Sequence, residues 1–342
     1  MTKGINCRLW GIHSRKPVHL IRLENEHGAY VELTDFGARI VSIVVPDKYG
    51  KLENIVLGFS ELEAYIEDNC YIGSTIGPFA NRISNSAFYL EGEKYAFEPN
   101  DGRNLNHSGT KGFHSLIFDF ALENTTVIFK KHLKDKSDGF PGNREVEIHY
   151  TWSDQNELLI LHKMTSDKNL PVSMTNHAYF NLSGKAGSIG EHRLKVSSSV
   201  CLELNSEHLP SGRYITAQDK LFNGEVIKHK FGDVDQKLSG LNTFFVLSDT
   251  ICISKPAAIL TDEESGRIME VYTDLPVLLL YTGEFLQSRL IGHNGRPYQP
   301  FDGLCLECQN YPDSPGKPGF PSAIVNASSP YNHQIKLKFS HQ

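Results

Sequence analysis

The stretch Leu304-Cys305-Leu306-Glu307-Cys308-Gln309-Asn310 reads as a buried strand with an acid at its centre. Side chains of a strand alternate between its faces, so Leu304 and Leu306 should point one way and Glu307 the other. The Pro- and Gly-rich run 311–321 that follows cannot continue a strand and predicts an irregular loop. A carboxylate held on a strand beside such a loop suits a catalytic base, although an acid paired with a buried Arg or Lys gives the same pattern.

Most of the remaining chain consists of short runs of apolar and β-branched residues separated by turn residues. We expect strands or strand pairs at 19–23, 29–33, 38–45, 88–97, 116–122, 126–131, 145–152, 157–164, 192–204, 243–285 and 334–339. No linker and no internal repeat interrupts them. The sequence therefore predicts an all-β fold, a large antiparallel β-sandwich, with residues 1–342 forming a single domain.

Helices are expected in two places only. Residues 60–68 favour a short helix in which Ser60 is the cap and Glu63, three residues later, completes a capping box. A second short helix is possible near 217–222. The long loop 100–109 lies between ordered segments and is expected to be functional.

Composition excludes several classes of function. The chain has 342 residues, 39% hydrophobic and 22% charged, with a formal net charge of −6, so no nucleic-acid or membrane partner is expected. No apolar run approaches the ~18–20 residues of a membrane span. The first eight residues lack the apolar core of a signal peptide, which predicts a cytoplasmic location.

The six cysteines are expected to be reduced small hydrophobes that bind no metal. The only close pair is Cys305-x-x-Cys308, and no second such pair or clustered histidine completes a zinc site. On a strand these two thiols would also face opposite ways.

Four further polar residues stand where the pattern does not require them. Each also has a structural explanation: His177 could be a core histidine bonded to a carbonyl, Arg82 of Asn81-Arg82 a solvated arginine, and His107 a surface histidine. With Glu307 they make one carboxylate, two imidazoles and one guanidinium. No phosphate loop, HExxH or GxSxG motif is present. The set favours acid/base chemistry without a cofactor on a neutral polar substrate.

Taken in order, these motifs resemble the aldose 1-epimerase (galactose mutarotase) family over nearly the whole chain. The segments that carry the resemblance are 57–59, 76–83, 104–109 with 112–113, 139–142, 175–182, 209–212, 281–283 and 306–310. Asn176-His177-Ala178-Tyr179-Phe180-Asn181-Leu182 and the segment around Glu307 are the most specific.

The resemblance implies a galactose mutarotase-like supersandwich with a cleft for one monosaccharide. It implies that Glu307 is the general base that deprotonates the C1 hydroxyl and that His177 is the general acid that protonates the ring oxygen. Arg82 and His107 would bind the sugar, and Asn81 would help to position them. Ring opening, rotation about C1–C2 and reclosure would interconvert the anomers of galactose or glucose. A monomer or homodimer is expected.

Three positions depart from the family pattern. Pro78 stands where the family usually has Arg, and Asn106-His107-Ser108-Gly109 replaces Leu-His-Gly-Gly. Asn242 aligns with an Asp that binds sugar hydroxyls, and an amide carries no charge. We therefore expect Asn242 to bind the sugar with altered selectivity. An epimerase for a hexose 6-phosphate, or a sugar-binding or regulatory protein with weak or no activity, remains an alternative.

Overall fold

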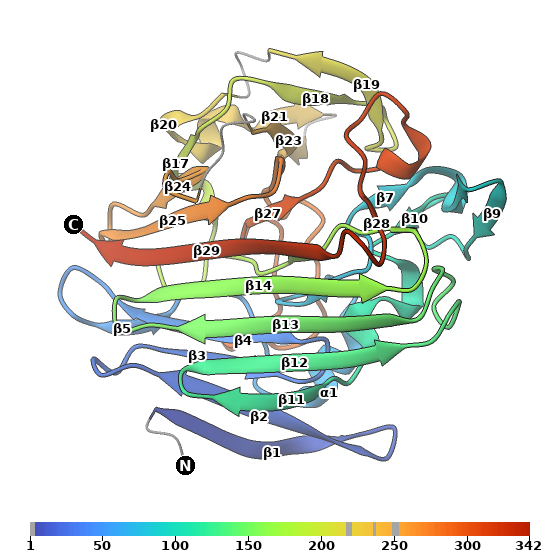
Figure 1. The fold of residues 1–342 in the computed structure, drawn as a ribbon. Coiled ribbons are helices and arrows are strands. Elements are labelled where there is room, and N and C mark those ends of the chain that lie inside the picture. Colours follow the sequence, from blue (N-terminus) through green and yellow to red (C-terminus); the bar gives the residue numbers. More distant parts are fainter. Residues whose placement is uncertain (1–3, 217–220, 235–236, 248–252) are drawn as a thin grey trace.

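A nine-stranded antiparallel sheet forms one layer of the protein (Figure 1). The structure, a computed structural model, describes residues 4–216, 221–234, 237–247 and 253–342. In spatial order the sheet contains β11 (Asp119–Glu123), β12 (Thr126–Leu133), β13 (Arg144–Trp152), β14 (Glu157–Ser166), β29 (Tyr331–His341), β25 (Arg267–Thr273), β24 (Ala258–Thr261), β17 (Arg193–Val196) and β20 (Asn223–Val226). Strands β13 and β14 alternate buried and less buried residues, as expected for a sheet with one face on a core.

Two five-stranded sheets cover the inner face of this layer. The first consists of β1 (Ile5–His13), β2 (Lys16–Glu24), β3 (Tyr30–Thr34), β4 (Arg39–Pro46) and β5 (Leu52–Asn54). The second, in spatial order, consists of β19 (Pro210–Ile215), β18 (Cys201–Leu204), β23 (Asn242–Val246), β26 (Val277–Tyr281) and β27 (Cys305–Gln309). One hydrophobic cluster contains side chains from all three sheets, including Val31, Ile148 and Leu306. The predicted all-β antiparallel sandwich is therefore confirmed.

Short strand pairs attach the loops to these sheets. They are β6 (Thr75–Ile76) with β16 (Thr175–Asn176), β7 (Arg82–Ile83) with β10 (Leu105–Asn106), β8 (Ala87–Leu90) with β9 (Glu93–Ala96), β15 (Leu170–Pro171) with β28 (Ile324–Val325), and β21 (Gly232–Val234) with β22 (Lys237–Ser239). The described residues contain one α-helix, α1 (Leu62–Glu67), and several single 3₁₀ turns.

The central strand β27 follows the alternation read from its sequence. Leu306 and Cys308 belong to the large core between the layers, whereas Cys305 belongs to a second cluster on the opposite face. Glu307 shares that opposite face, since it pairs with Leu279 of β26 and lies two residues from Cys305. The fold thus places the carboxylate on the face turned away from the nine-stranded sheet.

Several local predictions are corrected. The capping box is wrong, because α1 begins at Leu62 with Glu61 at the N-cap position and no side chain bonded there. The expected strand region 192–204 is two strands, β17 and β18, which belong to different sheets. The expected helix near 217–222 falls mainly on residues 217–220, which lie outside the described residues.

Candidate active site

All six side chains singled out in the sequence line one cleft of about 440 Å³. It lies on the outer face of the second five-stranded sheet and is bounded by loops from the first half of the chain. The predicted residues in it are Asn81, Arg82, His107, His177, Asn242 and Glu307. Its other lining residues are Asn69, Cys70, Tyr71, Asn100, Asp101, Asn106, Tyr179, His208, Leu279, Tyr281 and Phe285.

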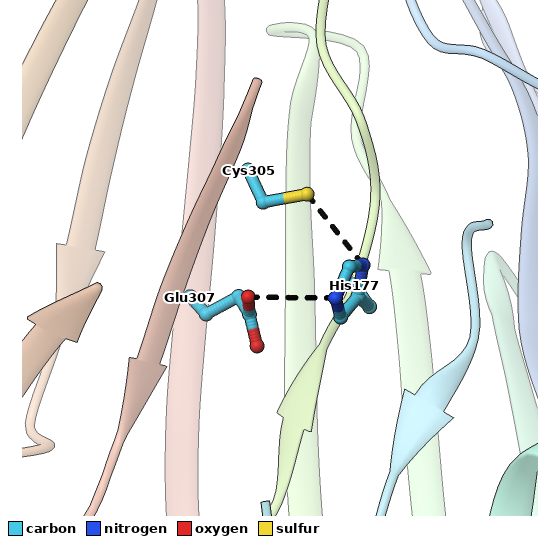
Figure 2. Close-up of side chains that lie close together, drawn as sticks. All are labelled: His177, Cys305 and Glu307. Atoms are coloured by element: carbon cyan, nitrogen blue, oxygen red, sulfur yellow. Dashed lines mark hydrogen bonds and ion pairs between the residues drawn. The ribbon is translucent and has the colours of Figure 1, made fainter. Parts of the chain in front are cut away.

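Glu307 and His177 form the buried centre of the cleft. Oε1 of Glu307 lies 3.6 Å from Nε2 of His177, and the two side chains are 1% and 5% exposed (Figure 2). That separation is longer than a hydrogen bond. The second carboxylate oxygen, Oε2, is buried and has no protein partner. An acid and a base thus face each other with unused hydrogen-bonding capacity, which a substrate hydroxyl can satisfy.

The backbone fixes His177 just beyond the end of a strand. Strand β16 ends at Asn176, so His177 follows the strand and does not share a strand face with Tyr179. The His177 N–H donates to the Ser74 carbonyl at 2.8 Å, and its own carbonyl accepts from the Gly73 N–H at 3.0 Å. The Tyr179 ring nevertheless lies 5.1 Å from the imidazole between ring centres. Glu307 is therefore oriented by strand β27, and His177 by the backbone hydrogen bonds that join it to residues 73 and 74.

His107 is oriented by the backbone of Asn81. The Asn81 N–H donates to Nδ1 of His107 at 3.2 Å, and the His107 N–H donates to the Asn81 carbonyl at 3.2 Å. Because Nδ1 accepts, the ring proton of a neutral His107 is on Nε2. Both residues have positive φ, +50° and +64°, and the mutual bonds hold them there. His107 is thereby presented as a hydrogen-bond donor.

Arg82 and Asn242 occupy the sides of the cleft. The Nε of Arg82 donates to Asp101 Oδ2 at 2.6 Å, so its charge is already partnered. Asn242 begins strand β23, and its amide Nδ2 lies 3.2 Å from Nδ1 of His208. Of the other two departures from the family pattern, Asn106 lines the cleft and Pro78 does not.

Comparisons with known proteins agree over almost the whole chain. The aldose 1-epimerase family model matches residues 19–338. Galactose mutarotase of Homo sapiens is 33% identical over 319 residues, which are 91% of each chain. Aldose 1-epimerase of Escherichia coli (strain K12) is 32% identical over 312 residues, 90% of each chain. The chain belongs to the aldose 1-epimerase family.

Solved structures give the same result for the fold. An aldose epimerase homologue from C. elegans superposes with a TM-score of 0.88 at 29% identity, covering 94% of this chain and 98% of that one. The galactose 1-epimerase of Lactobacillus acidophilus NCFM has a TM-score of 0.85 at 23% identity, covering 100% and 99%. The supersandwich and the isomerase-class activity expected from the sequence, interconversion of aldose anomers, are confirmed.

Burial moves the pKa values of the two central groups of this epimerase in opposite directions. It raises the pKa of Glu307 to about 8, against the lowering effect of the nearby Arg82 charge. It lowers the pKa of His177 to about 4; a backbone hydrogen bond opposes this effect, and the Arg39 charge adds to it. Near neutral pH the pair therefore holds one proton. Burial, followed by the charges of His177 and Arg82, also keeps the pKa of His107 well below its usual value.

A cluster of metal-ligand types exists that residue spacing did not reveal. His177, Cys305 and Glu307 offer ligand atoms that all lie within 4.8 Å of one another (Figure 2). However, the Cys305 thiol faces Nδ1 of His177 at 3.5 Å, whereas Glu307 faces Nε2. An imidazole nitrogen binds one ion, so a single metal cannot use both of these contacts without rearrangement. The expectation that the enzyme needs no metal stays a prediction.

The sequence missed several lining residues. His208 precedes the Leu209-Pro210-Ser211-Gly212 motif but resembles any surface histidine, and Asp101 is one of several polar residues in the long loop. Only their placement beside predicted residues distinguishes them: Asp101 contacts Arg82, and His208 contacts Asn242. The aromatic residues Tyr179 and Phe285 also line the cleft.

Proposed function

We propose that Glu307 and His177 are the acid/base pair that opens and recloses the ring of a free aldohexose, with galactose or glucose as the substrate. The observation that carries this proposal is their approach, 3.6 Å between Oε1 and Nε2 at the buried end of a polar cleft. A pyranose places its C1 hydroxyl oxygen and its ring oxygen on the same carbon. Two groups that face each other at this spacing are suited to contact both oxygens.

The chemistry is a transfer of two protons with one bond broken. Glu307 takes the proton from the C1 hydroxyl, a C1=O double bond forms, and the bond from C1 to the ring oxygen breaks. The electron pair stays on the ring oxygen, which takes a proton from His177. After rotation about C1–C2 the same steps run in reverse on the other face of the aldehyde. No electron is gained or lost, so proton transfer alone completes the reaction.

The proton content of the pair supports this assignment. In the free enzyme near neutral pH the one shared proton lies on Glu307, because its pKa is about 8 and that of His177 about 4. The reactive form, with Glu307 ionised and His177 protonated, contains the same number of protons. The two pKa values therefore belong to the pair, and the pair is competent over the interval between them. Each group must act in both protonation states, since the reaction runs both ways.

Three neighbours support binding of the ring. His107 presents an Nε2–H donor, and Arg82 presents guanidinium N–H groups besides the one given to Asp101. Asn81 acts through His107, because its backbone amide fixes the imidazole. We propose that these groups hold the ring oxygen and neighbouring hydroxyls during ring opening, and that Asn242 binds hydroxyls farther away.

A neutral hexose suits the cleft better than a hexose 6-phosphate. Among the described lining residues Arg82 is the one side chain with a permanent positive charge, and Asp101 already neutralises it. A phosphate would need uncommitted cations. The two relatives cited above carry the names galactose mutarotase and aldose 1-epimerase, which supports galactose or glucose.

Catalysis and binding can be separated with glycosides. Methyl β-D-galactoside keeps the other hydroxyls, but its O1 is methylated and has no proton for Glu307 to remove. It should inhibit galactose mutarotation competitively without reacting itself. Galactose 6-phosphate serves as the matched probe for the alternative substrate. Faster equilibration of galactose 6-phosphate than of galactose, or no inhibition by the methyl glycoside, would contradict the proposal.

Location, domain organisation and partners complete the proposed function. No helix in the described part of the chain has the length and apolar character needed to cross a membrane. The net charge of −6 supports a protein without a nucleic-acid partner. A cytoplasmic location, a single domain and a monomer or homodimer remain predictions.

A further inference from the structure

The turn between β18 and β19 is held by its own hydrogen bonds and carries two polar side chains, Glu207 and His208, of which His208 lines the cleft. Oδ1 of Asn205 accepts hydrogen bonds from the N–H groups of Glu207 at 2.9 Å and Leu209 at 3.0 Å. The His208 N–H donates to the Asn205 carbonyl at 3.0 Å, and His208 has a φ of +58°. A non-glycine residue in this conformation needs local bonds to hold it. These hydrogen bonds fix the backbone of the turn and thereby the directions in which the side chains of Glu207 and His208 leave it.

Glu207 attaches this turn to the long loop 100–109. Its Oε2 accepts from Nδ2 of Asn104 at 3.0 Å, and its Oε1 lies 3.0 Å from an Arg103 guanidinium nitrogen. Asn104 and Arg103 belong to the long loop that also carries His107. The turn thus connects the edge of the second five-stranded sheet to the loop that supplies a predicted sugar-binding residue.

The other side chain, His208, is held by Asn242. Their Nδ1 and Nδ2 atoms are 3.2 Å apart, and an amide nitrogen can only donate, so Nδ1 of His208 must accept. The ring proton is therefore on Nε2, and the pair presents one N–H donor from the imidazole and one acceptor oxygen from the amide. Burial and the Arg82 charge lower the pKa of His208, which favours this neutral form. Both side chains line the cleft.

The pair is separated from the reacting centre by about the size of a sugar ring. Asn242 pairs with Tyr281, and Tyr281 pairs with Cys305 on the strand that carries Glu307. Two strand spacings of about 4.8 Å place the backbone of Asn242 roughly 10 Å from that strand. Asn242 and Glu307 lie on the same face of this sheet, so the separation leaves room for one ring over the strand between them.

We propose that His208 is a specificity-determining residue, held by Asn242 as an Nε2–H donor to a sugar hydroxyl remote from C1. This proposal rests on the proposed function, because it takes a free hexose with C1 at Glu307 as the ligand. It also accounts for the departure at Asn242. An amide at this position keeps the imidazole neutral and supplies an acceptor, whereas a carboxylate would favour a protonated imidazole and a charged pair. The pair then selects among sugars by the position of one hydroxyl.

The test compares His208→Ala, His208→Gln, Asn242→Ala and the double alanine variant on galactose, glucose and a series of deoxy sugars that each lack one hydroxyl. His208→Ala should raise KM for galactose about five- to tenfold, the equivalent of one lost hydrogen bond, with kcat within about twofold. The effect should disappear for the one deoxy sugar that lacks the contacted hydroxyl. The double variant should be no worse than the poorer single variant. His208→Gln, which retains an N–H donor, should recover part of the loss.

Other results would overturn the proposal. If His208→Ala raised KM equally for every deoxy sugar, His208 would be a structural residue of the turn. The same conclusion would follow if His208→Ala lowered kcat equally for all sugars and also lowered the melting temperature. His27→Ala, at an exposed histidine outside the cleft, is the matched control. If the wild-type enzyme accelerates no sugar, the proposed function fails, and dissociation constants for the same sugars still decide whether His208 discriminates among them.

Discussion

Replacing Glu307 by Gln should stabilise the protein, and increasingly so as the pH rises. In the folded state burial raises the pKa of this carboxyl from 4.5 to about 8. The unfolded chain has no such burial, so its carboxyl ionises from about pH 4.5 upward. The wild type therefore loses stability as the pH rises from about 4.5, the pKa in the unfolded chain, to about 8, the pKa in the folded protein. Above pH 8 no further stability is lost. A glutamine amide has nothing to ionise and avoids this loss.

The size of the effect follows from the two pKa values. At pH 7 the unfolded carboxyl is ionised and the folded one is mostly neutral, which costs the wild type about 1.4 kcal/mol for each pH unit above 4.5, or about 3 kcal/mol. At pH 9 the whole difference applies, which is about 5 kcal/mol. At pH 5 the cost falls to less than about 1 kcal/mol. The neutral side chains are similar in size, and Oε2 has no protein partner to lose.

Denaturant unfolding at pH 5, 7 and 9 measures this difference between the wild type and Glu307→Gln. The stability gap should widen with pH and reach its full size above pH 8. Glu264→Gln is the matched control, because the Glu264 side chain is 73% exposed and should change stability little at any of these pH values. A gap that is absent at pH 9, or that does not vary with pH, would refute the claim that a buried, proton-carrying Glu307 destabilises the fold.

Three further predictions concern activity. The kcat/KM for galactose, corrected for the uncatalysed reaction, should give a bell-shaped curve against pH. The pair Glu307 and His177 holds two protons below about pH 4 and none above about pH 8, and neither form can act as acid and base together. A profile that stays flat to pH 9.5 would contradict the shared proton. Asp101→Asn should raise KM about two- to fivefold with little change in kcat, because it releases Arg82 from a partly exposed ion pair; a tenfold fall in kcat would mean that Asp101 takes part in the chemistry. Dialysis against a chelator should leave the rate within about twofold, whereas loss of activity that zinc restores would mean that His177, Cys305 and Glu307 hold a required ion.

The sequence was most informative where strand alternation or a complete motif was present. Strand β13 was recognisable because its apolar residues recur at every second position, and β12 and β14 because each contains a run of apolar, β-sheet-favouring residues. Strand β1 was missed because four of its consecutive residues are exposed and no alternation marks it. The capping box failed because Ser60 and Glu63 have the right spacing, but the helix begins one residue later than that spacing requires.

The sequence also predicted only part of the candidate active site. Glu307 could be singled out because an acid interrupts an apolar strand, and the motifs supplied its companions. His208 and Asp101 carry no such local signal, since their importance arises from positions on different elements that meet across the cleft. The opposite pKa shifts of Glu307 and His177 also depend on burial of the folded pair, which no single segment determines.

The optical rotation of fresh α-D-galactose and α-D-glucose tests the central claim most directly. With wild-type enzyme the rotation should reach equilibrium far faster than without it. With Glu307→Gln, whose folded state should be at least as stable, the catalysed rate should fall by about 10²–10⁴-fold, as expected for loss of a general base. Equal rates for the wild type and this variant would show that Glu307 is not the base, and no acceleration by either would contradict mutarotation of these two sugars.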